Sequence, residues 1–142
     1  ILYDTDNPTL VHYFGELGYT DSKKFQVNFR TDLYGYSTKS LSEPWGRPTY
    51  SLKLSGNYNY YQKLVFGASL RALGGIKGLN QQSGQQEKLD GIFDLNLSVD
   101  YLFSKRFSAF VIGKNIFSKE YELYFNYPSR GFTAIAGISY SF

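Results

Sequence analysis

One group of side chains in this 142-residue sequence could bind a ligand. Tyr36, Trp45 and Arg47 lie in or beside a polar stretch, residues 37–47, that is rich in Ser, Thr, Gly and Pro and is typical of a long loop. Aromatic rings offer faces for stacking, and a guanidinium offers a fixed charge with several hydrogen-bond donors. We therefore predict that Tyr36, Trp45 and Arg47 contribute to a ligand-binding surface. The alternative is that Trp45 only packs its own loop.

Few residues in the sequence could support catalysis. His12 is the single histidine, and the chain has no cysteine. Zinc and similar metals need several ligands at close spacing, and a hydrolase needs a nucleophile, a base and an orienting partner. The run Gly74-Gly75-Ile76-Lys77-Gly78 lacks the spacing of a phosphate-binding loop. The sequence predicts no catalytic residue, no metal, no cofactor and no enzyme activity, with His12 as an ordinary wall or rim residue.

Composition favours strands over helices. Aromatic residues make up 19% of the chain, and there are 14 Tyr, 12 Phe and 14 Gly, a mixture that suits strands and tight turns. No window of about 18 apolar residues could form a membrane-spanning helix. No basic start followed by an apolar core indicates a signal peptide, so we expect any export signal to lie upstream of Ile1. The net charge of +3 is too small to indicate nucleic-acid binding. We expect residues 1–142 to be the C-terminal part of one domain.

Apolar and polar residues alternate along several segments, as they do in strands with two different faces. The clearest segment is residues 50–60, where Tyr or Leu alternates with Ser, Lys or Asn. Asp90, Asp94, Asn96 and Asp100 share one face of residues 89–103, where they could line a cation path or simply form a polar wall; we favour the wall. We predict inward-pointing side chains at Lys53, Arg71, Asp94, Asn96 and Asp100. We predict lipid contact for Tyr50, Leu52, Leu54, Phe66, Leu70, Phe93, Leu95, Leu97, Val99, Ile138 and Tyr140.

The lengths of the strands and loops point to a membrane. About seven strands of roughly 10 to 15 residues are expected, which is at or above the length that a tilted strand needs to cross a bilayer. Short connections near residues 21–23, 61–63 and 104–106 alternate with long ones near 37–47, 75–88 and 118–130. Outer-membrane barrels show this alternation, with short periplasmic turns and long outer loops. The predicted fold is all-β, a transmembrane antiparallel β-barrel. A soluble barrel or sandwich is the alternative, but it explains neither feature.

Counting residues in the short turns predicts the strand register. Odd turns of three residues keep the apolar face on one side, so that Tyr19 should meet Phe25, Tyr60 should meet Leu64 and Phe103 should meet Phe107. Residues 107–117 are apolar on both faces, and the same parity leaves Phe110 and Ile112 on the inner face. We expect these two side chains to be covered by a plug, an inserted loop or another element inside the barrel. Ile92 is the one misfit in the pattern of residues 89–103.

Aromatic residues set the orientation. They gather at the strand ends beside the short turns, as tyrosines do at the headgroup level of a membrane, which places those turns and Phe142 on the periplasmic side. Counting strands back from Phe142 then puts residues 1–8 outside the cell. Seven strands with an external start break the usual even count, so we expect the chain to be incomplete as a barrel. The strands at 10–20 and 131–142 should each pair with a strand from another segment or chain, rather than with each other.

The C-terminal third of the chain resembles TonB-dependent outer-membrane receptors. The resemblance rests on Gly113-Lys114-Asn115-Ile116-Phe117-Ser118-Lys119-Glu120-Tyr121, on Tyr127-Pro128 ahead of residues 131–142, and on the terminal Phe142. It is strongest over residues 89–142 and extends upstream by architecture only. The resemblance implies a barrel of about 22 strands around a plug, importing iron chelates, cobalamin or glycans with energy passed on by TonB. No plug and no TonB-contacting segment appear among these residues.

The last six residues resemble a second, more general signal. Gly137, Tyr140 and Phe142 fit the Gly-x-x-aromatic-x-aromatic ending that the barrel-assembly machinery recognises in outer-membrane proteins, although Ile135 stands where a polar residue is usual. This signal supports a location in the outer membrane rather than a particular function.

Two membrane functions remain open from the sequence, and a soluble carrier barrel is a third alternative. The first is the barrel segment of a TonB-dependent receptor, with lipid, further barrel strands, a plug, the assembly machinery and TonB as partners and no nucleic acid. The second is a small eight-stranded barrel with a structural or adhesive role.

Overall fold

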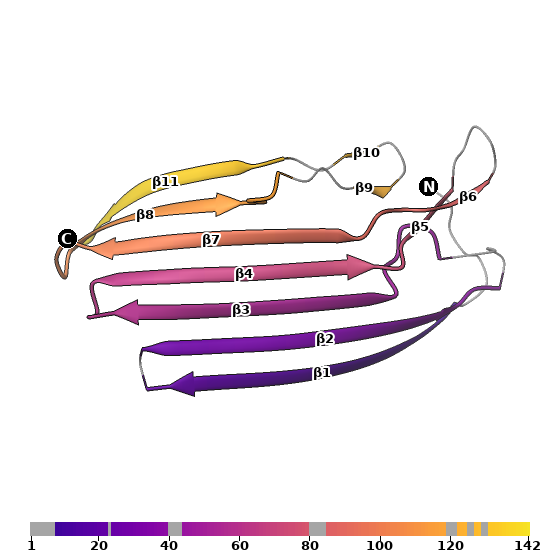
Figure 1. Cartoon of the computed structure of the whole chain (residues 1–142), viewed down its shortest axis with the longest axis horizontal. Helices are drawn as coiled ribbons and strands as arrows, with labels where there is room; N and C mark the ends of the chain where they lie inside the picture. Colours follow the sequence, from indigo (N-terminus) through magenta and orange to yellow (C-terminus); the bar gives the residue numbers. More distant parts are fainter. Residues whose placement is uncertain are drawn as a thin grey trace.

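Seven long strands form one antiparallel sheet in the computed structural model, which describes residues 8–22, 24–39, 44–79, 85–118, 122–124, 127–128 and 131–142 (Figure 1). The order across the sheet is β1-β2-β3-β4-β7-β8-β11, so each long strand pairs with the next long strand along the chain. The strands are β1 (Thr9–Asp21), β2 (Phe25–Ser37), β3 (Tyr50–Tyr60), β4 (Leu64–Gly74), β7 (Ile92–Leu102), β8 (Phe107–Lys114) and β11 (Thr133–Tyr140). The predicted all-β architecture of antiparallel strands is confirmed.

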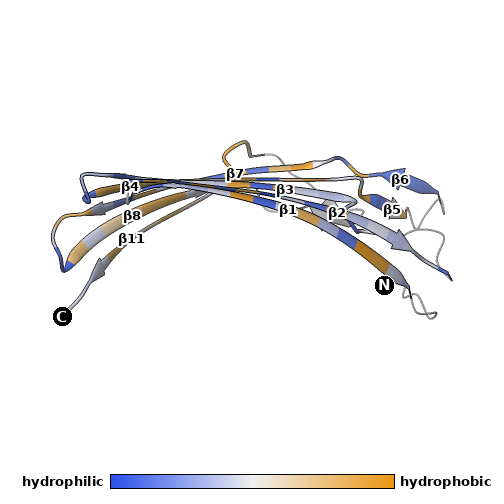
Figure 2. Cartoon of the chain, turned by 90° about the horizontal axis from the view of Figure 1, so that it is seen from below, coloured by the Kyte–Doolittle hydropathy of each residue, from blue (hydrophilic) through white to orange (hydrophobic). Residues whose placement is uncertain are grey.

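The sheet is an open arch rather than a closed ring (Figure 2). β1 and β11 form its two edges and do not pair with each other among the described residues. All three short connections lie at the end of the sheet where the C-terminus is, and the long connections lie at the opposite end (Figure 1); we call these the short-turn end and the long-loop end. The described residues contain no helix that is both long and apolar enough to cross a membrane.

The long connections contain structure that the sequence did not predict. Residues between β4 and β7 form a small hairpin of β5 (Lys77–Leu79) and β6 (Gln86–Lys88), and residues between β8 and β11 form another of β9 (Glu122–Tyr124) and β10 (Tyr127–Pro128). Strands this short have almost no periodicity to detect, which is why they read as loop.

The predicted register is right at two turns and wrong at one. Tyr60 lies opposite Leu64, as predicted. Leu102 lies opposite Ser108, in the predicted register. The rings of the predicted partners Phe103 and Phe107 are in contact, with centroids 5.1 Å apart, although the last backbone hydrogen bonds of the hairpin join Phe107 to Ser104. Between β1 and β2, however, Tyr19 pairs with Val27 and not with Phe25. The hairpin extends to Asp21 and Phe25, so the register moves by two residues while the faces stay as predicted.

The turn between β3 and β4 forms without glycine. The Lys63 N–H donates to the Tyr60 carbonyl at 3.1 Å, and Tyr61 and Gln62 both have positive φ, +49° and +58°. Two successive left-handed residues are the mark of a type I′ turn, whose twist matches that of the strands. The usual Asn-Gly is replaced by Tyr-Gln, so the turn holds two residues in a conformation that favours glycine.

Cross-strand pairing puts the predicted inward and lipid-facing residues on opposite faces of the sheet. Residues directly opposite each other share a face, and Leu54, Leu70 and Leu95 form one such row while Lys53, Arg71 and Asp94 form the next. We call the first the apolar face and the second the polar face. Many large hydrophobic side chains of the apolar face are exposed, including Leu17 and Ile138, each 73% exposed. A soluble protein would bury such a surface, whereas lipid would cover it.

The misfit at Ile92 belongs to a small core at the long-loop end. Leu73, Ile76 and Ile92 are 5%, 0% and 3% exposed, and Leu89 packs against them. Leu73 and Ile92 face each other on the polar face, at the point where the chain leaves β4 for the β5–β6 hairpin. These side chains therefore fix the start and the end of that hairpin onto the sheet.

A second apolar group lies on the polar face near the β11 edge of the sheet. Phe110 lies opposite Asp100, and Ile112 lies opposite Ser98, which places both on the polar face as predicted. Ile135 pairs with Ile112 on the same face and is 40% exposed. Phe110, Ile112 and Ile135 thus form one apolar patch. Ile135 is the residue that stands where the C-terminal signal usually has a polar side chain.

Candidate ligand-binding site and the charged network beside it

A pocket of about 250 Å³ opens at the long-loop end of β2. Tyr34 and Tyr36 point into it from the polar face of the strand, and their ring centroids are 6.2 Å apart. Arg47 and Lys77 bring positive charge from the loop after β2 and from β5. The whole lining consists of Tyr34, Gly35, Tyr36, Pro44, Arg47, Thr49, Gly75 and Lys77.

Backbone hydrogen bonds hold the loop that carries Arg47. Arg47 N–H donates to the Pro44 carbonyl at 3.2 Å across a β-turn, and Gly46 in this turn has a φ of +71°. The Gly46 N–H then donates to the Lys77 carbonyl at 2.9 Å, which ties the turn to β5. Tyr36 completes the frame, because its hydroxyl donates to the Pro48 carbonyl at 3.1 Å. The pocket is therefore built from a strand, a tight turn and a loop hairpin that are bonded to one another.

The floor of the pocket depends on a glycine. Gly75 has a φ of +67°, and a Cβ placed there would collide with the side chain of Thr49. Any other residue would thus suffer both backbone strain and a steric clash. This close approach lets the chain leaving β4 pass against Thr49 and deliver Lys77 to the pocket.

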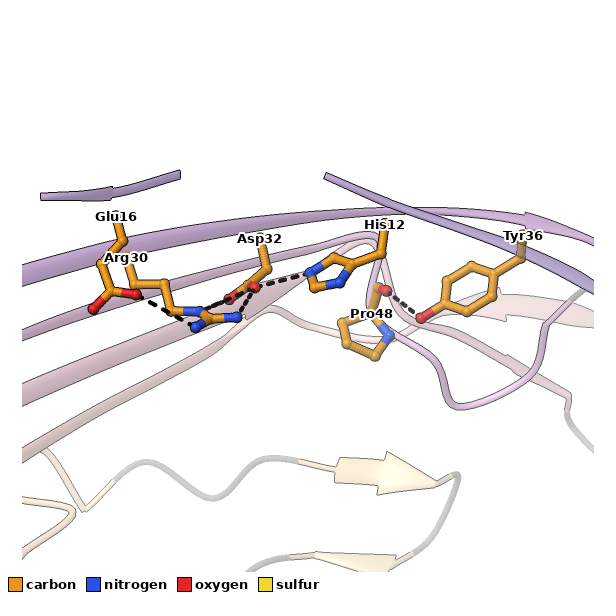
Figure 3. A network of polar contacts seen from close by, with 6 residues as sticks. All are labelled: His12, Glu16, Arg30, Asp32, Tyr36 and Pro48. Atoms are coloured by element: carbon orange, nitrogen blue, oxygen red, sulfur yellow. Dashed lines mark hydrogen bonds and ion pairs between the residues drawn. The ribbon is translucent and has the colours of Figure 1, made fainter. Parts of the chain in front are cut away.

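A network of charged side chains lies next to the pocket, on the same face of β1 and β2 (Figure 3). Asp32 is its centre and is only 1% exposed. Arg30 donates to both carboxylate oxygens of Asp32, with its Nη2 2.9 Å from Oδ1 and its Nε 3.2 Å from Oδ2. His12 Nε2 lies 2.9 Å from Asp32 Oδ1, and Arg30 also approaches Glu16 at 3.5 Å. A buried carboxylate is tolerable here because several donors satisfy it.

Aromatic stacking links the network to the pocket. The His12 ring stacks on Tyr34 with centroids 4.7 Å apart and planes inclined by 12°. Since Tyr34 also lines the pocket, a chain of contacts runs from Asp32 through His12 and Tyr34 to Tyr36. This arrangement can hold the tyrosine rings in fixed positions for a ligand.

The His12–Asp32 pair has the geometry of a base and its orienting carboxylate. Among the described residues, His12 forms no hydrogen bond to a Ser, Thr or Tyr hydroxyl. The described part of the chain also has no group of His, Asp and Glu suited to a metal ion. What the arrangement can do is position rings and charges, which is the work of a binding site.

The structure brings together two of the three predicted ligand-binding residues. Tyr36 and Arg47 line the same pocket, whereas Trp45 is partly buried in the turn and does not line it. Sequence reasoning did not single out Tyr34, Lys77 or the His12–Asp32–Arg30 network. A signal for the network existed in the adjacent same-face pair Arg30 and Asp32, but its partners depend on the β1–β2 register, which the turn count did not yield.

The three residues of the C-terminal signal lie at different places: Gly137 and Tyr140 are on opposite faces of β11, and Phe142 follows its end. Gly137 lies on the polar face opposite Phe110, while Tyr140 and Phe142 follow the apolar face, with ring centroids 5.3 Å apart. Phe142 is fully exposed. The two aromatic rings thus stand together at the short-turn end, where a membrane surface or another protein could reach them.

Solved structures of an outer-membrane receptor share this fold. Three match over 94% of this chain at 18% identity: the ferripyoverdine receptor of the outer membrane of Pseudomonas aeruginosa bound to ferripyoverdine (TM-score 0.78), the complex of FpvAI with pyocin S2 (TM-score 0.77), and P. aeruginosa FpvA bound to heterologous pyoverdines (TM-score 0.78). The chain spans 19% of the length of each of these proteins. No protein-family model matches the sequence, and neither does any curated protein. The predicted fold class, an antiparallel sheet that forms part of a larger barrel, is confirmed.

Proposed function

We propose that this chain forms part of the barrel of a TonB-dependent receptor in the bacterial outer membrane, with its short-turn end in the periplasm. The observation that carries the proposal is the fold: almost the whole chain superimposes on one fifth of an outer-membrane receptor. The apolar face, with exposed large hydrophobic side chains on every long strand, supports contact with lipid. The resemblance of residues 89–142 to TonB-dependent receptors supports the same assignment.

The shape of the sheet favours this function over a small eight-stranded barrel. Seven strands of an eight-stranded ring would curl almost completely around, leaving room for one more strand between β1 and β11. The sheet is instead a shallow arch with its edges far from closure (Figure 2). Such an arch fits a barrel with many more strands.

The pocket between Tyr36 and Arg47 would then lie at the extracellular mouth. Its tyrosine rings and two cationic side chains suit a ligand with aromatic groups and negative charge. A ferric chelate has this chemistry, and the matched receptor is bound to ferripyoverdine. We propose iron chelates as the ligand class, ahead of cobalamin and glycans, and a role in binding and transport rather than catalysis.

The partners of the proposed receptor follow from its unpaired strand edges and its exposed apolar patch. The open edges of β1 and β11 would leave backbone N–H and C=O groups unpaired in lipid, at a cost of several kcal/mol for each group. Further barrel strands from another segment or chain would satisfy these edges. A plug inside the barrel would cover Phe110 and Ile112, TonB would supply energy, and the barrel-assembly machinery would read Gly137, Tyr140 and Phe142.

The test uses the full-length protein that contains this chain. We expect it in the outer-membrane fraction, extractable only with detergent, and we expect saturable binding of one probe among ferripyoverdine, cobalamin and a maltodextrin. Arg47→Ala should weaken that binding about tenfold, or ~1.4 kcal/mol, while Arg106→Ala, which removes a cation from the short-turn end, should not. Uptake should also stop in cells without TonB. Recovery in a soluble fraction, or TonB-independent uptake, would contradict the proposal.

A further inference from the structure

Three cationic side chains stand side by side on the polar face, in the middle of the sheet. Arg30 on β2 lies opposite Lys53 on β3, and Lys53 lies opposite Arg71 on β4. Directly opposed side chains have their Cβ atoms about 5 Å apart, and like charges in such positions destabilise a sheet. A negative charge close to this row would therefore stabilise the sheet.

Among the described residues, Arg30 alone of the three forms an ion pair, although Asp94 lies directly opposite Arg71 on β7. Arg30 is paired with Asp32 and Glu16. Lys53 and Arg71 are exposed, and neither forms an ion pair or a side-chain hydrogen bond with another described residue. Asp94 is the neighbour of Arg71 on β7, yet its buried Oδ1 has no hydrogen-bond partner among the described residues.

Hydroxyl groups complete the surroundings of the two unpaired cations. Ser55 follows Lys53 on the same face of β3, Ser69 precedes Arg71 on β4, and Ser55 and Ser69 lie opposite each other. Ser69 Oγ is 3.5 Å from the Asn96 amide nitrogen, which donates to it and leaves the hydroxyl hydrogen free. Successive same-face residues are about 7 Å apart along a strand, so two cations and two hydroxyl donors fit in an area of about 5 by 7 Å.

We propose that Lys53, Arg71, Ser55 and Ser69 form a carboxylate-binding site on the polar face of the sheet. Arginine binds a carboxylate through two parallel hydrogen bonds, lysine adds a point charge, and the hydroxyls donate to the remaining lone pairs. The carboxylate comes either from an acidic side chain of another segment that lies against this face or from a diffusing anionic solute. The site is about six residues from Tyr36 along the strands, roughly 20 Å, so it is separate from the pocket at Arg47.

The experiment compares three forms of the detergent-solubilised full-length protein: wild type, the double variant Lys53→Gln/Arg71→Gln, and the control Lys63→Gln/Arg106→Gln. The control removes the same charge from two exposed residues of the short turns. Thermal unfolding is followed in sodium glutarate and in sodium chloride of equal ionic strength. This measurement needs neither the receptor's ligand nor TonB, so its outcome is independent of the transport assay.

The two sources of the carboxylate predict different results. If an acidic side chain occupies the site, the Lys53→Gln/Arg71→Gln variant unfolds at a lower temperature than both wild type and control, and glutarate adds nothing beyond chloride. If a solute occupies it, glutarate raises the unfolding temperature of wild type and control in a saturable way and leaves that variant unchanged. The site does not exist if the variant is as stable as the control and all three proteins respond equally to the two salts.

Discussion

The ring of Phe110 lies over the backbone of Gly137 on the neighbouring strand. A Cβ added to Gly137 would come within 2.6 Å of Cζ of that ring, closer than any real contact. Position 137 thus has a packing reason to be glycine that is separate from the proposed recognition by the assembly machinery.

A packing role for Gly137 predicts rescue by its neighbour. Gly137→Val should destabilise the folded barrel by about 1 to 3 kcal/mol, because the ring of Phe110 must move. Combining it with Phe110→Ala should restore part of that loss, as a double-variant cycle in urea would show. If Gly137 acts only as a recognition signal, Phe110→Ala will not improve the amount of assembled Gly137→Val protein in the outer membrane.

The apolar patch of Phe110, Ile112 and Ile135 should be covered by another protein segment inside the barrel. Ile112→Asp in the full-length protein should cost about 1 to 3 kcal/mol, since it would bury an unpaired polar group under whatever covers Ile112. Ser108→Asp, on the same face of the same strand, is the matched control. Urea unfolding provides the comparison, and equal midpoints for both variants would mean that water, not protein, lies against the patch.

The two faces of β7 should respond differently to an added charge. Leu97→Arg on the apolar face should cost roughly 2 to 4 kcal/mol, as arginine does near the middle of a bilayer. Ser98→Arg on the polar face should cost little. Refolding into liposomes at increasing urea measures both, and an equal cost would refute the assignment of the faces.

The strained turn between β3 and β4 offers a way to stabilise the protein. Gln62 has a φ of +58°, and Gln62→Gly should raise the free energy of unfolding by about 0.5 to 1 kcal/mol, because glycine adopts this conformation without strain. Lys63→Gly, the next residue, has no such strain to relieve and should be neutral or destabilising. A reversed order of the two variants in urea unfolding would contradict the type I′ assignment.

The charged network should be more sensitive at its centre than at its rim. Asp32→Ala removes the partner of Arg30 and of His12 at a position that is 1% exposed. Glu16→Ala removes an exposed carboxylate 3.5 Å from the same arginine. We expect Asp32→Ala to lower the urea midpoint several times more than Glu16→Ala, because exposed pairs contribute little. High salt should diminish the smaller effect and leave most of the larger one.

The strands and their faces could be predicted from the sequence because of the geometry of β-strands. Alternation has a period of two, so it identifies the strands and assigns faces, even for Phe110 and Ile112, where both faces are apolar. A shift of the register by two residues leaves every side chain on the same face, so the pattern cannot detect it. The predicted partner of Tyr19 was therefore wrong although its face was right.

Features that depend on contacts between distant segments could not be predicted. The His12–Asp32 contact is a diagonal one across two strands, and the pocket joins β2 to a turn and to β5, all of which require the register and the loop path. Ile92 and Ile135 were visible only as exceptions to a pattern. Both exceptions proved to be parts of apolar groups on the polar face.

The cluster of Leu73, Ile76, Ile92 and Leu89 has a consequence for engineering. These four side chains hold the β5–β6 hairpin on the sheet although they lie outside its two strands. The Leu89 N–H donates to the Ile76 carbonyl at 3.0 Å and closes the base of the hairpin. The segment between Lys77 and Leu89 can therefore be replaced as a unit: a foreign sequence inserted there keeps the same anchoring residues, and the sheet keeps its own contacts.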